Sequence, residues 1–176
     1  MAVQTVTGQI QQSVSFTETA VLAFNAVAPY PCTLPTGNLT YSAGTGGAGN
    51  VDTVYAANVS LASTTLAVNL FNASLVSPSG KTCVFLRVRE FVVANLSTVA
   101  GDLLEVYATA STGVTWLPLV ATCITVYPGG VFRLSDWFSI TTNGYLVVTG
   151  NNGITFNSVS NTVVFDVLIA GNSSVA

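Results

Sequence analysis

Few side chains in this chain have the chemistry that catalysis needs. The sequence has no histidine and only four basic and seven acidic residues. The run Gly80-Lys81-Thr82 resembles the end of a phosphate-binding loop. Such a loop has another glycine five residues earlier, where this chain has Leu75, and it leads into a helix. The residues after Thr82 have the composition of a strand, so we interpret the run as a turn that leads into a strand.

Two further groups of residues are weak candidates for a catalytic or metal site. Ser77 or Ser79 beside Lys81 would form a nucleophilic Ser-Lys dyad, but their proline- and glycine-containing context is typical of a turn. Asp102 and Glu105 are spaced for a carboxylate pair. Calcium would need about six to eight oxygen ligands, and glycoside hydrolysis would need a second carboxylate across a cleft. The sequence therefore predicts no catalytic residue, no metal site and no cofactor, and a protein that is not an enzyme.

The remaining charged and aromatic side chains have structural interpretations. Trp116 and Trp137 would suit a sugar-binding platform, but both stand among apolar residues, which favours packing in a core or an interface. We expect the charged residues of the second half of the chain to pair with one another or with a neighbouring subunit. These residues are Arg87, Arg89, Glu90, Arg133 and Asp136.

The three cysteines are far apart in the sequence, at Cys32, Cys83 and Cys123. No Cys-x-x-Cys pair exists, which argues against a zinc finger or a thioredoxin-like site. We interpret them as small buried hydrophobic residues, and one disulfide with a free thiol left over stays open as an alternative.

The chain has the composition of an all-β protein. β-branched and aromatic runs alternate with clusters of Gly, Asn, Ser and Pro, and turns recur about every 8–12 residues. This rhythm predicts a single domain, residues 1–176, folded as a jelly-roll-like antiparallel β-sandwich of about eight to ten strands. The clearest strands are expected at residues 65–77, 82–95, 103–110, 114–120, 122–127, 131–134, 145–149, 154–159 and 162–170, the last of them central in its sheet.

The first 16 residues are polar and weakly patterned. Strands of this kind are poorly specified in register, so residues 1–16 are a candidate N-terminal arm that pairs with another subunit during assembly.

The scarcity of charge excludes some partners and favours others. Charged residues make up 6% of the chain, against about 25% in an average domain, and no Lys or Arg precedes Lys81. Binding nucleic acid through its phosphates needs clustered basic residues, so we expect none. We also expect no membrane-spanning helix, because no run of about 18 apolar residues occurs. A β-protein without charge on its edges should associate, which predicts a homo-oligomer with extensive low-charge interfaces.

In composition and strand rhythm, most clearly over residues 114–170, the chain resembles the structural proteins of viral and phage particles. The similar proteins are small jelly-roll capsid subunits and head-decoration subunits of tailed phages. The resemblance implies a self-assembling subunit of a virion or virus-like particle, assembled in the host cytoplasm and in contact with other virion proteins. Capsid proteins that condense nucleic acid commonly carry a basic arm, which residues 1–80 lack, so a decoration subunit or a shell without charge-based packaging fits better.

Two other functions share these features. A subunit of an extracellular filament or surface layer would have the same low charge and would use an N-terminal strand to complete its neighbour. A carbohydrate-binding β-sandwich module would expose Trp116 or Trp137 on a flat face.

Overall fold

A computed structural model describes residues 6–10, 14–18, 22–23, 39–43, 50–71, 75–77, 80–135 and 144–173, with the backbone alone before residue 51. Apart from one 3₁₀ turn at Val120–Thr122, its regular elements are all strands. The all-β prediction is confirmed.

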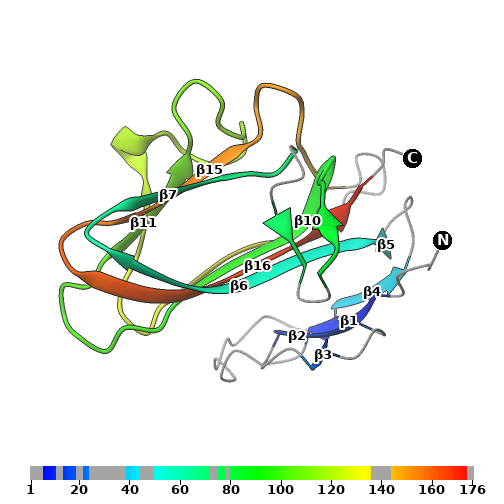
Figure 1. Ribbon diagram of the computed structural model, residues 1–176, viewed down its shortest axis with the longest axis horizontal. Helices are drawn as coiled ribbons and strands as arrows, with labels where there is room; N and C mark the ends of the chain where they lie inside the picture. The colour runs from blue at the N-terminus through cyan, green and yellow to red at the C-terminus, as the bar shows by residue number, and fades with distance from the viewer. Residues whose placement is uncertain are drawn as a thin grey trace.

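Two antiparallel sheets face each other as a sandwich (Figure 1), one of four strands and one of five. The fifth is the short strand β14 (Tyr145–Leu146), which pairs with β10 beside the main order. We name each sheet after a central strand. The β16 sheet has the order β13-β10-β16-β6, and the β15 sheet has the order β12-β11-β15-β7. As predicted, the last long strand is central in its sheet. The bounds are β6 Thr53–Ala62, β7 Thr65–Asn69, β10 Arg87–Asn95, β11 Leu104–Ala108, β12 Ile124–Val126, β13 Val131–Ser135, β15 Gly153–Ser158 and β16 Thr162–Asn172.

The pairing of these eight strands is nested along the chain. The first strand pairs with the last, β6 with β16, and the second with the seventh, β7 with β15. The third pairs with the sixth, β10 with β13, and the fourth with the fifth, β11 with β12. This is the order that results when one long hairpin is folded across two sheets, and the jelly-roll-like topology stays a prediction.

Alternating side chains from both sheets fill the space between them. Phe156 of β15 lies with its ring centroid 5.1 Å from that of Phe165 and 6.3 Å from that of Phe91, both on the β16 sheet. All three rings are fully buried. These aromatic contacts hold the two sheets together.

Smaller elements surround the sandwich. An N-terminal sheet has the order β3-β2-β1-β4-β5, and Figure 1 shows its first four strands beneath the β16 sheet, near the end of β16. Here β1 pairs with β2 and β4 of its own chain. The assembly-arm hypothesis for residues 1–16 stays a prediction. The other bounds are β1 Val6–Ile10, β2 Val14–Glu18, β3 Leu22–Ala23, β4 Leu39–Ala43, β5 Asn50–Val51, β8 Leu75–Val76, β9 Thr82–Cys83 and β14 Tyr145–Leu146.

The strand predicted at residues 114–120 is wrong. This segment belongs to the connection between β11 and β12 and ends in the 3₁₀ turn. It is apolar because it packs against the core, where Val114 and Leu117 are buried, and not because it joins a sheet. Its Pro118 carbonyl accepts a hydrogen bond from the N–H of Ala108, which fixes the segment against the end of β11.

The predicted strands at residues 65–77 and 82–95 are also too long. Each is interrupted, so that β8 and β9 form a separate hairpin between β7 and β10. A register shift between Val88 and Glu90 makes Arg89 an extra residue in β10, which interrupts the regular alternation of side chains along this strand. Across from this bulge, a Cβ atom on Gly171 would lie 2.0 Å from the Arg87 carbonyl oxygen, so only glycine fits there.

Candidate assembly surface

The described residues that could have formed a phosphate or nucleophile site share one hairpin turn. Ser77, Gly80 and Lys81 lie in the turn of the β8–β9 hairpin, where the N–H groups of Ser77 and Gly80 donate to the carbonyls of Lys81 and Ser77, respectively. The Lys81 N–H donates to the Ser77 hydroxyl at 3.1 Å, so that hydroxyl stabilises the turn. The interpretation of Gly80-Lys81-Thr82 as a turn before a strand is confirmed. Ser79, Cys32, Asp136 and Trp137 lie outside the described residues.

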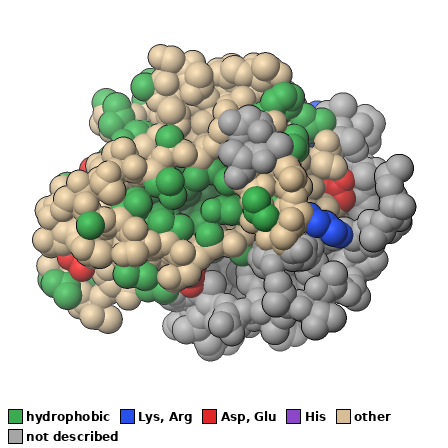
Figure 2. All heavy atoms as spheres, viewed as in Figure 1, with side chains coloured by type: hydrophobic (Ala, Val, Ile, Leu, Met, Phe, Trp, Pro, Cys, Tyr) green, Lys and Arg blue, Asp and Glu red, His purple; other side chains and the backbone are tan. Residues whose placement is uncertain are grey.

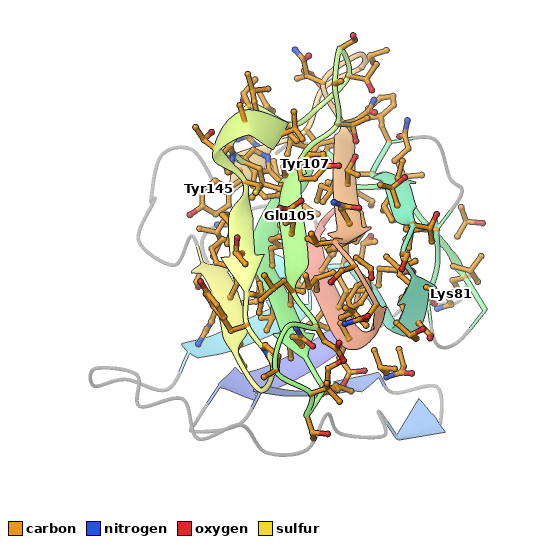
Figure 3. All side chains as sticks on the ribbon, turned by 90° about the vertical axis from the view of Figure 1, so that its left-hand side faces the viewer. Lys81, Glu105, Tyr107 and Tyr145 are labelled. Atoms are coloured by element: carbon orange, nitrogen blue, oxygen red, sulfur yellow. The ribbon has the colours of Figure 1, made fainter. Side chains whose placement is uncertain are left out.

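The two carboxylates of the proposed pair have separate partners. Asp102 accepts a hydrogen bond from the Asn161 amide at 2.9 Å, and Glu105 accepts one from the Asn157 amide at 2.8 Å. In Figure 3, Lys81 and Tyr145 lie on opposite sides of Glu105, so these side chains do not converge. Among the described residues, no group of three or more His, Cys, Asp or Glu side chains is placed to hold a metal ion. No helix within them is long and apolar enough to cross a membrane.

The charged residues of the β16 sheet form a buried pair, as the sequence predicts. Glu90 and Arg133 occupy neighbouring strands, β10 and β13, and the guanidinium binds the carboxylate through Nε and Nη2, the latter at 3.1 Å from Oε2. The Glu90 side chain is fully buried. Arg89 is also buried and donates from Nε to the Asn172 side chain at 3.2 Å. These groups act within the subunit.

Trp116 packs against the core, as predicted, rather than forming a flat platform. Its ring centroid lies 5.8 Å from that of Phe91 and 5.3 Å from that of Tyr145. The indole is half-buried at the end of the sandwich. A sugar ring would therefore find only part of this side chain exposed.

The cysteines differ from one another. Cys83 is buried, as predicted, and its thiol donates to the Val54 carbonyl. Burial was the wrong prediction for Cys123, which is half-buried just before β12, and these two cysteines are not bonded to each other. Desolvation raises the pKa of the Cys123 thiol, and the negative charge of Glu105 and a hydrogen bond to it raise this pKa further.

The Cys123 environment predicts a slow thiol. Because its pKa is raised, less of it is thiolate at neutral pH, and its alkylation by iodoacetamide should increase only at higher pH than for an ordinary cysteine. Glu105→Gln removes the neighbouring charge and should shift this pH profile downward, with several-fold faster alkylation at pH 8. Peptide mass mapping would follow Cys123 separately from the other thiols. Identical pH profiles in both proteins would contradict the role of Glu105.

Exposed large hydrophobic side chains avoid the eight sandwich strands. Within the described part of the chain, each of them lies in a connection between these strands or in the short insertions β8 and β14. Among the described residues of the eight sandwich strands, none is an exposed large hydrophobic side chain. These side chains are Val76, Val99, Leu119, Val120, Tyr127, Leu146, Val148 and Val159.

Three of these side chains share one end of the sandwich. Because neighbouring strands are antiparallel, the connections at residues 63–64, 96–103, 127–130 and 159–161 all lie at the same end, on the left of Figure 1. We call this end the loop tip. Its exposed hydrophobic side chains are Val99 (59% exposed), Tyr127 (66%) and Val159 (47%). Its one charged residue, Asp102, is buried. The loop tip is thus an uncharged surface with apolar groups on three loops.

A buried asparagine holds two of these loops in place. The Asn95 amide group donates to the Asp102 carbonyl at 2.7 Å and to the Val126 carbonyl at 3.0 Å. Its side-chain oxygen accepts the Ser97 N–H at 3.0 Å. The backbone of Asn95 also exchanges hydrogen bonds with Gly129 and Gly130. Asn95 therefore fixes the 96–103 loop and the 127–130 loop relative to each other.

The other two connections join the same network. The Asn161 side chain binds the Asp102 carboxylate, and the Asn161 carbonyl accepts the Ser63 N–H at 3.1 Å. The Val159 N–H donates to the Leu103 carbonyl at 3.3 Å. The four connections of the loop tip are therefore held together by one hydrogen-bonded network.

No protein-family model, curated protein or solved structure matches this chain.

Proposed function

We propose that this chain is a structural, self-assembling subunit whose loop tip contacts neighbouring copies. The observation that carries this proposal is the loop tip itself, where Val99, Tyr127 and Val159 project from hydrogen-bonded loops without an exposed charge. A few residues near the centre of an interface contribute most of its binding energy, and tyrosine is enriched among them. Burying this end costs no charge desolvation, because Asp102 is already buried and bound to Asn161.

The assembly that we infer is a virion or virus-like particle, as its shell or as a decoration subunit. The nested strand pairing supports a jelly-roll subunit, an architecture common in viral capsids. The absence of Lys and Arg before Lys81 supports a particle that does not hold nucleic acid by charge. A filament or surface layer remains the alternative arrangement of the same contacts, and electron microscopy distinguishes closed shells from filaments.

The test replaces two exposed side chains of the loop tip. The purified wild-type chain is expected to form large uniform oligomers, and Val99→Lys/Tyr127→Lys should shift it toward the 18.1 kDa subunit. Four to six lysines brought together around one contact would repel one another, and their desolvation opposes association. Light scattering measures the mass, and negative-stain microscopy shows the particles.

The matched control adds the same charge elsewhere. Thr112→Lys/Thr115→Lys places two lysines on exposed positions at the opposite end of the sandwich and should leave the oligomers intact. A wild-type chain that stays monomeric at micromolar concentration would overturn the proposed function. Equal disruption by both pairs of lysine substitutions would show that added positive charge weakens assembly wherever it is placed. The loop tip would then not be the contact.

A further inference from the structure

Among the residues that the structure describes, no strand pairs with part of one edge of the β16 sheet. β6 pairs with β16 along its whole length, from Thr53 opposite Gly171 to Ala62 opposite Thr162, without a bulge. β6 is the last strand in this order, so no described strand of the sheet pairs with its other side. The β8–β9 hairpin reaches the beginning of this side, where the Cys83 thiol donates to the Val54 carbonyl. The unpaired stretch is therefore residues 56–62, which we call the open edge.

The open edge lacks the features that keep β-proteins from pairing edge to edge. Exposed edges are usually protected by charged side chains, proline or a bulge. Residues 56–62 contain no charged residue and no proline, and their register with β16 is regular. Their exposed side chains are Asn58, Ser60 and Ala62, which are small or uncharged.

The core is also incompletely covered along this side. Figure 2 shows hydrophobic side chains gathered between β6 and β7 on the face toward the viewer, with no Lys, Arg, Asp or Glu among them. Ala57 and Val59 of β6 and Leu66 of β7 are half-buried residues that pack against the core. A further strand beside β6 would cover this opening.

We propose that the open edge pairs antiparallel with the same edge of a second copy, so that two β16 sheets become one continuous sheet. This contact rests on the proposed function, because it assumes that copies of the chain associate. It adds a two-fold contact at the sheet edge to the contact at the loop tip. Two-fold pairing needs only one surface, which contacts itself. The uncharged edge has no like charges to bring together.

The sequence of the open edge is complementary to itself in one register. If Val59 is the centre, Ala57 faces Leu61 of the other copy, and both point toward the core side. On the outer side, Asn58 faces Ser60 of the other copy, and Ala56 faces Ala62. Ala57 therefore meets a larger apolar residue, the polar residues meet each other, and the two alanines of the outer side meet each other.

The number of hydrogen bonds is sufficient for a specific contact. Seven paired residues on each strand offer about seven N–H···O bonds, since alternate residues exchange two each. A typical interface has roughly 10 ± 5 direct hydrogen bonds. The covered side chains of Ala57 and Val59 add apolar contact to this total.

A cysteine at the centre of the register tests the pairing. In Val59→Cys, the two substituted positions would have their Cα atoms about 4.5–5.5 Å apart, within the range of a disulfide. The assembled full-length variant should form covalent dimers under mild oxidation, on a non-reducing gel, with peptide mapping to show that the link joins position 59 of both copies. Asn58→Cys is the matched control: it is more exposed, but its two copies would be roughly 7–8 Å apart and should cross-link poorly.

A second variant does not depend on cross-linking. Asn58→Lys/Ser60→Lys puts four lysines across the pair and should weaken this contact at least tenfold, while the lysine introduced at position 58 can still reach Asp166, the present partner of Asn58. Thr112→Lys/Thr115→Lys should leave the contact intact. The proposal is overturned if Asn58→Cys cross-links as well as Val59→Cys, or if neither cross-links and the lysine variant assembles normally. In that case, large oligomers of the wild-type chain would still support the proposed function. A wild-type chain that stays monomeric would contradict both the pairing of the open edge and the proposed function.

Discussion

Glu90→Gln is expected to destabilise the folded subunit by about 3–5 kcal/mol, the usual cost of removing one partner of a buried ion pair. The Glu90 side chain is fully buried and the Arg133 side chain is 10% exposed, so the guanidinium would lose its charged partner without regaining water. Glutamine keeps the size of the side chain, and the loss therefore reports charge rather than packing. Urea unfolding at matched protein concentration measures the change.

A double variant distinguishes the loss of the ion pair from the burial of one unpaired charge. Glu90→Gln/Arg133→Met removes both charges and should recover much of the lost stability, because neither charge is then left buried alone. Glu105→Gln, on a half-exposed carboxylate of β11, is the matched control and should change stability by less than about 1 kcal/mol. If Glu90→Gln were as mild as this control, the pair would be solvated and its burial in the structure would be wrong.

The general type of fold was predictable because it depends on local pattern. The apolar run at residues 162–170 predicts a central strand, and β16 is that strand. The nested pairing could only be expected by analogy, because the choice of partner depends on contacts between residues far apart in the chain. In the pairing of β6 with β16, for example, even the nearest partners along the chain are Ala62 and Thr162.

Both errors occur where contacts with distant parts of the chain, and not the local residues, decide the structure. Residues 114–120 are as apolar as a strand, but they close the end of the core, and hydrophobicity alone cannot distinguish these two kinds of burial. The extra residue at Arg89 follows from the close approach of the Arg87 carbonyl to Gly171 of a distant strand. Such a constraint has no signal within residues 82–95.

The uncharged character of the candidate surface was predictable from the sequence, but its location on the fold was not. The lack of charge before Lys81 indicates association, yet Val99, Tyr127 and Val159 belong to three separate segments and meet only through the fold. Asn95 has no feature in the sequence that marks it as the buried amide between two loops. The glycines at 129 and 130, which bind its backbone, are the one local signal of a tight connection there.

Phe156→Ala should cost about 3–5 kcal/mol of subunit stability, the range for truncating a buried aromatic residue. The Phe156 ring belongs to β15 and contacts Phe165 and Phe91 of the facing sheet, so its removal opens a cavity between the two layers. Urea unfolding again measures the loss. Val148→Ala, at an exposed position, is the control and should stay within about 0.5 kcal/mol.

The same variant distinguishes folding from assembly. Phe156 is fully buried between the sheets and exposes no surface to a neighbouring copy, so Phe156→Ala should lower the unfolding midpoint while subunits that remain folded still form oligomers. Val99→Lys/Tyr127→Lys should do the reverse, because both side chains are exposed and contribute little to the core. If Phe156→Ala cost no more than Val148→Ala, the two sheets would not be packed through this ring. If both losses always occurred together, folding and assembly would be a single step, as in obligate oligomers whose subunits have no stable monomeric form.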